Sequence, residues 1–152
     1  MRLYLITGAS GLVGTNLLNK LLEEKDVKIV ALINKTPLHI KNDKIEQVRC
    51  NICNKEDIDK IFSKYNFEEN ICIHCAGVIT IKKKNSSNIN NVNINGTQNI
   101  IDACLNYNYK LVYVSSVDAM EKAPFGTPTT ETTNFSSDNL KGDYAKTKAR
   151  SN

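Results

Sequence analysis

The chain has 152 residues, 41% of them hydrophobic and 24% charged, which is typical of one soluble globular domain, here residues 1–152. No apolar run approaches the roughly 20 residues that a membrane span needs, so we expect no membrane partner. Because Met1–Ile6 runs directly into a glycine turn, we expect no signal peptide and a cytoplasmic location. The net charge of +4 comes from scattered lysines, and the one run of lysines, Lys82–Lys84, is interpreted as a solvated loop. Aromatic residues are not interleaved with the lysines, which argues against a nucleic-acid partner.

Apolar runs typical of buried strands alternate with helical periodicity along the chain. Strands are predicted over Arg2–Thr7, Val27–Ile33, Lys44–Arg49, Asn70–Cys75 and Lys110–Ser116. Helices are predicted over about Leu12–Lys25, Asp57–Phe62 and Ser86–Asn106, with a last helix that begins near Asp143. This alternation predicts an α/β fold, a doubly wound parallel sheet of the Rossmann type.

The longest predicted helix, Ser86–Asn106, has a periodic apolar face. Its inner side is expected to carry Ile89, Val92, Ile100, Ile101 and Leu105. Residues 117–142 contain two prolines and several threonines and serines, and they are expected to form a long loop.

A glycine-rich turn lies between the first predicted strand and the first predicted helix. Gly8 permits a tight turn, Gly11 lets the backbone approach a pyrophosphate, and Gly14 lets the helix pack closely on the sheet. The amides at the start of the helix would face the phosphates, where the helix dipole adds attraction. The pattern predicts a dinucleotide site formed by Gly8, Ser10, Gly11, Leu12, Val13 and Gly14; the alternative is a glycine turn with no ligand.

Polar residues follow the second and third predicted strands. A carboxylate after the second strand would accept hydrogen bonds from the ribose hydroxyls of NAD, whereas a cation there favours the 2′-phosphate of NADP. This chain has Asn34 and Lys35 at that place, which argues against strict use of NAD and favours NADP, unless Lys35 simply points to solvent. After the third strand, Asn51 and Ile52 lie where an asparagine side chain could bind the adenine amine.

Tyr144 and Lys148 lie one helical turn apart on the same face of the last predicted helix. A phenol is a poor base at neutral pH, but a neighbouring cation stabilises the phenolate, so such a pair can exchange protons with an alcohol or a carbonyl. Ser116, at the end of the fifth predicted strand, could donate to a substrate oxygen, and Asn93 could hold a water that links Lys148 to solvent. The alternative for Tyr144 and Lys148 is a solvated helix start with no chemistry.

Two cysteine pairs, Cys50-x-x-Cys53 and Cys72-x-x-Cys75, have the spacing of a structural zinc site. Cys72 and Cys75, however, lie within one predicted strand, where residues three apart point to opposite faces. A doubly wound order also places two other strands between the third and the fourth. We therefore expect no metal, and buried reduced thiols instead.

Five motifs follow one another along the chain: Thr7-Gly8-x-x-Gly11-x-x-Gly14, His74-Cys75-Ala76-Gly77, Asn93-Ile94-Asn95-Gly96-Thr97, Val114-Ser115-Ser116 and Tyr144-x-x-x-Lys148. Together they resemble the extended short-chain dehydrogenase/reductase family (NAD-dependent epimerase/dehydratase superfamily), and within it the dihydroflavonol-reductase-like and hydroxysteroid-dehydrogenase-like branch. The resemblance implies an NAD(P)-dependent oxidoreductase. In it Tyr144 would be the acid and base, Lys148 its partner and a ribose ligand, Ser116 the donor to the carbonyl and Asn93 a helper. Cofactor contacts would also come from Cys75, Ala76 and Gly77.

The chain departs from this family at its end. Family members have a carboxylate a few residues after the lysine, where this chain has Arg150-Ser151-Asn152, and they continue into further strands and a substrate-binding lobe. We therefore expect the cofactor half of an enzyme, which does not turn over its small-molecule substrate efficiently by itself. The resemblance also implies a homodimer contact through the Ser86–Asn106 helix and the Tyr144 helix. Two alternatives stay open: a sugar-nucleotide epimerase or dehydratase, which would hold its cofactor tightly, and a non-catalytic nucleotide-binding module.

Overall fold

The computed structural model describes residues 1–79, 86–130 and 136–151, so the Lys82–Lys84 run lies outside the described residues. The chain forms two compact units, and each is described by itself. The first comprises Met1–Ala76 and Asn99–Val114, and the second comprises Gly77–Gln98 and Ser115–Asn152. The single domain expected over residues 1–152 stays a prediction.

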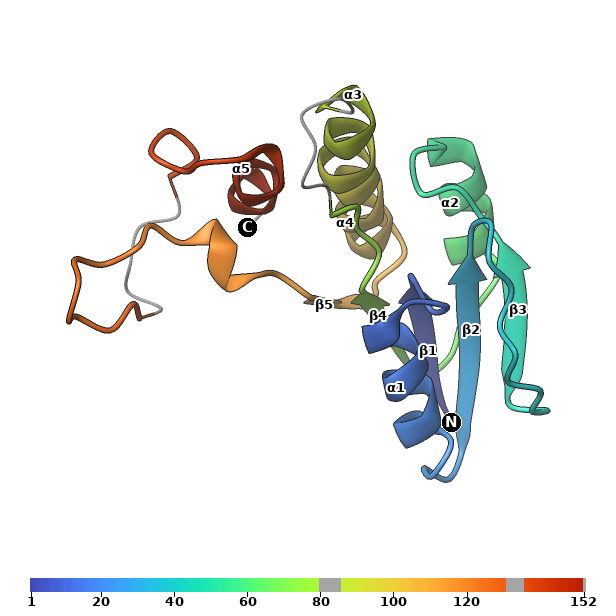
Figure 1. Cartoon of the computed structure of the whole chain (residues 1–152). Coiled ribbons are helices and arrows are strands. Elements are labelled where there is room, and N and C mark those ends of the chain that lie inside the picture. The colour runs from blue at the N-terminus through green and yellow to red at the C-terminus, as the bar shows by residue number, and fades with distance from the viewer. Residues whose placement is uncertain (80–85, 131–135, 152) are drawn as a thin grey trace. The chain divides into compact units, whose positions relative to one another are not determined.

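A parallel five-stranded sheet forms the centre of the first unit (Figure 1). Its strands are β1 (Arg2–Thr7), β2 (Val27–Ile33), β3 (Ile45–Arg49), β4 (Glu69–His74) and β5 (Lys110–Tyr113). Their order is β3-β2-β1-β4-β5, with Thr7 in register with Leu32 on one side and with His74 on the other. The predicted doubly wound α/β sheet is confirmed, and all five strands end at the same edge.

The fifth strand is shorter than predicted. It ends at Tyr113, three residues before Ser116, because β5 lies at the edge of the sheet that the described residues form, and the adjacent strand β4 ends opposite Tyr113 at His74. One more backbone hydrogen bond, from Val114 N to His74 O at 3.1 Å, closes the pairing. Ser115 and Ser116 therefore follow the strand as a separate segment that belongs to the second unit.

Helices α1 (Leu12–Leu21) and α2 (Lys55–Phe62) have boundaries that differ from those predicted. The first ends four residues before Lys25, and Asp26, at φ 55°, turns the chain back into β2. The second begins two residues before Asp57 because Asn54 caps it, with its side chain accepting hydrogen bonds from two backbone amides of the first turn.

The predicted helix Ser86–Asn106 is regular only at its two ends. It consists of α3 (Ser86–Asn90), a π-helical segment (Asn91–Gly96) and α4 (Thr97–Asn106). The expectation that Leu105 faces inward is wrong, because its side chain is 77% exposed. Leu105 lies five residues after the fully buried Ile100, which is about 140° around a helix of 3.6 residues per turn. Ala103 and Cys104 are buried in its place.

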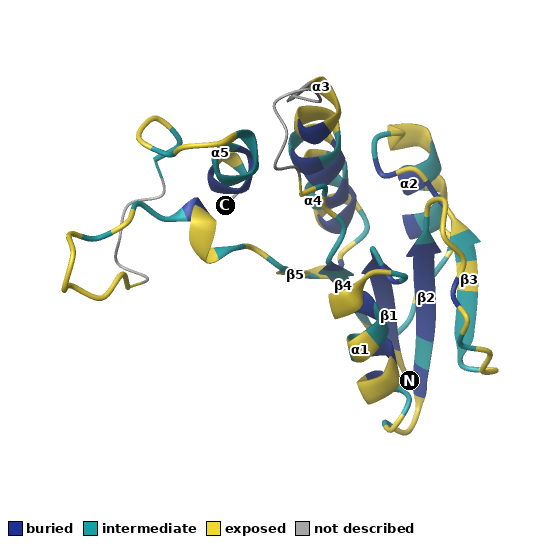
Figure 2. Ribbon diagram, viewed as in Figure 1, coloured by how far each residue is buried: buried dark blue, intermediate teal, exposed yellow. Residues whose placement is uncertain are grey.

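The core of the first unit lies against both faces of the central strands, as the burial colours of Figure 2 show for β1 and β2. Tyr4 and Ile6 of β1 pack with Leu18 and Leu21 of α1 on one face. Because side chains alternate along a strand, the fully buried Leu3 and Leu5 point to the other face. No helix in the described part of the chain is long and apolar enough to cross a membrane.

Candidate functional site

The turn from β1 to α1 requires glycine at two positions, Gly8 and Gly14. Gly8 has φ 64°, and its carbonyl accepts a hydrogen bond from Gly11 N at 3.0 Å. A Cβ at Gly8 would lie 2.7 Å from Ala76 N, and one at Gly14 would overlap the carbonyl oxygen of Gly8. The tight turn and the close helix packing expected from these two glycines are therefore present.

The N-terminus of α1 is open to an anion. Gly11 occupies the cap position, and no described side chain accepts a hydrogen bond there. The first turn carries no acidic residue, so the backbone amides and the positive end of the helix dipole are not neutralised locally. Leu12 and Val13 are 83% and 52% exposed, so they lie at the surface beside these amides and not in the core.

The ends of β2 and β3 bring further predicted residues to the same edge of the sheet. Asn34 and Lys35, just after β2, are exposed, and so is Asn51, two residues after β3. The Asn51 Oδ1 atom accepts a hydrogen bond from Cys53 N at 3.1 Å, so one of its two lone pairs already shapes the local turn. Ile52 is buried, and its carbonyl accepts from Asn99 Nδ2 at 2.9 Å, so its side chain belongs to the core.

The end of β4 is tied to the glycine turn through Thr7, the last residue of β1. The Thr7 hydroxyl lies 2.6 Å from Nδ1 of the buried His74 and accepts a hydrogen bond from Ala76 N at 3.1 Å. Cys75 N donates to the carbonyl of Thr7 at 3.3 Å. The predicted cofactor residues Cys75 and Ala76 thus lie directly against Gly8.

The second unit is organised around the buried side chain of Asn93, in the π-helical segment. Its Oδ1 atom accepts a hydrogen bond from Val78 N at 2.8 Å, and its Nδ2 atom donates to Val78 O at 3.0 Å and to Thr147 Oγ1 at 3.1 Å. Thr147 in turn donates to the carbonyl of Tyr144 at 2.8 Å. Asn93 therefore links the segment after β4 to α5 (Asp143–Arg150), the helix that carries Tyr144 and Lys148.

Lys148 is buried in this unit, with only 5% of its surface exposed. A Cβ added at Gly77 would lie 3.8 Å from Lys148 Nζ and 3.6 Å from Asn93 Oδ1, so these groups share one small region. Ser151, one turn after Thr147, has its hydroxyl within hydrogen-bond distance of two carbonyl oxygens, those of Asn93 (2.8 Å) and Thr147 (3.0 Å). Ser151 thus holds the end of α5 to the π-helical segment.

Ser116 caps a short 3₁₀ turn (Val117–Ala119), and its Oγ atom accepts a hydrogen bond from Asp118 N at 3.2 Å. Because this bond uses a lone pair, the hydroxyl proton of Ser116 can still be donated to a ligand. Ser115 beside it is exposed.

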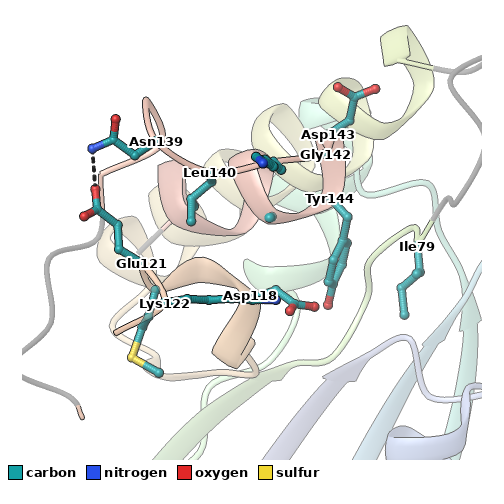
Figure 3. A pocket seen from close by; sticks show the side chains of 12 residues that line it. Ile79, Asp118, Glu121, Lys122, Asn139, Leu140, Gly142, Asp143 and Tyr144 are labelled. Atoms are coloured by element: carbon teal, nitrogen blue, oxygen red, sulfur yellow. Dashed lines mark hydrogen bonds between the residues drawn. The ribbon is translucent and has the colours of Figure 1, made fainter. Parts of the chain in front are cut away.

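A cavity of about 770 Å³ lies in the second unit, between the 3₁₀ turn and the start of α5. Tyr144 lines it together with Ile79, Asp118, Glu121 and Lys122. Figure 3 shows the Tyr144 side chain pointing into this space toward Asp118. The volume is within the range of small-molecule sites, which span roughly 300–1,000 Å³.

The five cysteines are free thiols. Burial, together with the carboxylate of Asp57, raises the pKa of Cys50 to about 11, and burial alone raises the pKa of Cys53. Within residues 1–79, 86–130 and 136–151, no three His, Cys, Asp or Glu side chains gather as metal ligands would.

The predicted residues thus gather in two groups. In the first unit, the glycine turn, Asn34, Lys35, Asn51, Cys75 and Ala76 lie at the edge where the strands end. In the second unit, Gly77, Asn93 and Lys148 lie close together, Tyr144 lines the cavity, and Ser116 caps the 3₁₀ turn whose Asp118 also lines it. Sequence reasoning missed Thr147, Ser151 and Asp118. Asp118 follows Ser116 by two residues, a position that could have drawn attention to it.

A family model described as the NAD dependent epimerase/dehydratase family matches residues 4–152. Among curated proteins, 3 beta-hydroxysteroid dehydrogenase/Delta 5→4-isomerase of Monkeypox virus and of Vaccinia virus (strain Copenhagen) are each 31% identical over 134 residues. These alignments cover 84% of this chain but 38% of each relative, so the chain matches less than half the length of these proteins.

Solved structures share the fold. The UDP-glucose 4-epimerase of Thermus thermophilus, in complex with NAD, superposes with a TM-score of 0.82 at 23% identity, covering 98% of this chain and 48% of that one. WbmH of Bordetella bronchiseptica, in complex with NAD⁺, gives 0.84 at 20% identity, with 99% and 51% covered. A monomeric L-threonine 3-dehydrogenase from a metagenome gives 0.69 at 26% identity, with 97% and 46% covered.

The substitution Gly8→Ala tests the close approach of the turn to Ala76. We expect it to lower the free energy of unfolding by more than about 3 kcal/mol, because backbone strain adds to overlap with backbone atoms that cannot move aside. Gly126→Ala is the matched control: Gly126 also has a positive φ, 87°, but no described atom lies within 4 Å of the added Cβ. Urea unfolding should show a loss of only about 1 kcal/mol there. Equal losses in the two variants would contradict the packing argument.

The substitution Thr147→Val tests the Asn93 network. Valine keeps the shape of threonine but leaves one Asn93 Nδ2 hydrogen without its partner in a buried place, which should cost about 1–3 kcal/mol of stability. Thr147→Ser retains the hydroxyl and should recover most of this loss. Hydrogen exchange at the amides of α5 should accelerate in the valine variant alone, and a valine variant as stable and as protected as the original chain would rule out the network.

Proposed function

The chain belongs to the NAD dependent epimerase/dehydratase family, and we propose that it is the nicotinamide-binding part of an oxidoreductase that interconverts a carbonyl and a secondary alcohol. The observation that carries this proposal is the burial of Lys148, one helical turn from Tyr144 at the wall of the cavity. Burying an ammonium group costs free energy, and lysine side chains are almost never buried for packing alone. A solvated helix start, the alternative reading of these residues, would leave Lys148 in water.

The first unit fits the dinucleotide. The open amides at the start of α1 suit a pyrophosphate, and Gly8, which packs against Ala76, has no side chain at the turn. Asn34 and Lys35 would meet the adenosine ribose, and the remaining lone pair of Asn51 Oδ1 would accept from the adenine amine. Ile52 would contribute through its backbone, since its side chain is buried.

The second unit supplies the proton chemistry. A bound nicotinamide would give or take the hydride. Tyr144 Oη would hold the proton that moves to or from the substrate oxygen, and the positive charge of Lys148 would stabilise the phenolate. Ser116, whose lone pair is engaged by Asp118 N, would donate its proton to the same oxygen and polarise it.

In this proposal Asn93 has a positioning role. Both hydrogens of its amide group and one lone pair of its oxygen are used within the protein, on Val78 and Thr147. The side chain is therefore better suited to fixing α5 and the Gly77–Val78 segment than to holding a water, the role expected from the sequence. Lys148 reaches its place because Thr147, the preceding residue, is fixed by Asn93.

The viral relatives favour an alcohol or ketone substrate, since their name describes a hydroxysteroid dehydrogenase. The epimerases resemble this chain in fold, at 20–23% identity, and leave a sugar-nucleotide epimerase as the second candidate. That enzyme keeps its cofactor through the reaction, so nicotinamide that remains bound through purification would favour it. Ligand binding that Tyr144→Phe leaves unchanged, together with no activity even in a longer chain, would favour a non-catalytic module.

The proposal is tested by titrating the chain with NADH and following nicotinamide fluorescence. Saturable binding is expected, and Lys148→Met should weaken it about tenfold, which corresponds to about 1.4 kcal/mol. Lys146→Met, on the same helix, is the matched control and should bind as the original chain does. Failure of the original chain to bind, or equal binding by both variants, would contradict the role of Lys148.

A further inference from the structure

His74 is a buried histidine that the proposed chemistry does not use. It is the last residue of β4 and has no exposed surface, and it is in register with Thr7, the equally buried last residue of β1. Its ring stacks on Tyr113 of β5, with the ring centroids 5.6 Å apart and the planes inclined by 21°. This polar ring therefore lies at the edge where the strands end, directly before the glycine turn can begin to bind a nucleotide.

The hydrogen bonds of Thr7 determine which nitrogen of the His74 ring carries the proton. The Thr7 oxygen accepts from Ala76 N at 3.1 Å and lies 2.6 Å from His74 Nδ1. Within the described part of the chain, no other acceptor lies within hydrogen-bond distance of the Thr7 hydroxyl. Because a buried hydroxyl that donates to nothing costs free energy, its hydrogen goes to His74 Nδ1. This nitrogen is then an acceptor, and the neutral ring carries its proton on Nε2.

The contact between Thr7 and His74 also strengthens the hold on Ala76. A hydroxyl that donates a hydrogen bond becomes a better acceptor, so the bond from Ala76 N to Thr7 gains from the ring nitrogen. Ala76 N lies only 2.7 Å from the place of a Cβ at Gly8, so the position of Ala76 sets how closely the turn approaches β4. Without the ring nitrogen, the Thr7 hydroxyl would have to turn toward another acceptor, and its oxygen would move away from Ala76.

We propose that His74, in the tautomer with its proton on Nε2, is a positioning residue for the nucleotide-binding turn. Through Thr7 it holds Ala76 against Gly8, and so it keeps the amides that face the pyrophosphate in place. This inference rests on the proposed function, because it concerns the same dinucleotide site. His74 acts only through Thr7: its ring touches neither cofactor nor substrate and takes no part in proton transfer to the substrate.

The tautomer is tested by nitrogen-15 magnetic resonance of the imidazole rings in the original chain at neutral pH. His74 should show an unprotonated Nδ1 and a protonated Nε2. The second histidine of the chain, His39, is exposed and should show the averaged signals of an imidazole in water, so it serves as an internal reference. A proton on Nδ1 of His74 would overturn the inference.

The positioning role is tested by titrating variants with NADH and following nicotinamide fluorescence. His74→Phe keeps an aromatic ring beside Tyr113 but removes the acceptor, and it should weaken binding about fivefold or more. His74→Asn places an oxygen near the position of Nδ1 and should recover most of the affinity. Ile73→Val, on the same strand but on the opposite face, is the matched control and should bind as the original chain does.

A double-mutant cycle with Thr7→Val separates this role from a general loss of packing. Both substitutions break the same chain of contacts, so the variant that carries both should bind NADH within about twofold of the weaker single variant. Should His74→Phe fail to fold, Thr7→Val against Thr7→Ser makes the same comparison, and only the serine variant should keep the affinity.

Three results would overturn the inference and leave the proposed function standing: losses that multiply in the double variant, unchanged binding by His74→Phe, or equal binding by Thr7→Val and Thr7→Ser. If the original chain does not bind NADH, the proposed function fails, and the positioning role fails with it.

Discussion

The first unit depends on the close approach of the β1–α1 turn to the end of β4. Gly8 and Gly14 leave no Cβ to separate the turn from Ala76 and from the start of α1, and Thr7 joins the two strand ends through its hydroxyl. Because β1 is central in a parallel sheet, this contact places the amides of α1 at the edge where all five strands end. Open α/β sheets bind ligands at this edge for the same geometric reason.

The second unit depends on a different constraint, the need to satisfy a buried amide. Asn93 holds Val78 on one side and Thr147 on the other, and Ser151 adds a bond to its backbone carbonyl. These polar contacts fix α5, whose sequence is too polar to be held by apolar packing alone: its buried residues are Thr147, Lys148 and Ala149. Hydrogen bonds made by its neighbours thus hold Lys148 in the interior, although burying its ammonium group costs free energy.

Local chemistry explains why the glycine turn, the five strands and the helix that carries Tyr144 and Lys148 could be predicted from the sequence. Turn glycines and strand periodicity are set by residues close in the chain. The end of β5, the exposure of Leu105 and the partners of Asn93 depend on which distant residues lie opposite, and no local pattern contains that information. Asp118 was missed because a single charged residue after a serine resembles any other surface charge until its neighbours are known.

The most direct test of a nicotinamide site at the glycine turn is an amide nuclear magnetic resonance spectrum of the isotopically labelled chain, recorded while NADPH is added. We expect saturable shifts that are largest at the amides of Gly8–Gly14, with further changes at Asn34–Lys35 and at Asn51. No saturable shift, or saturable shifts confined to residues away from this edge of the sheet, would contradict it.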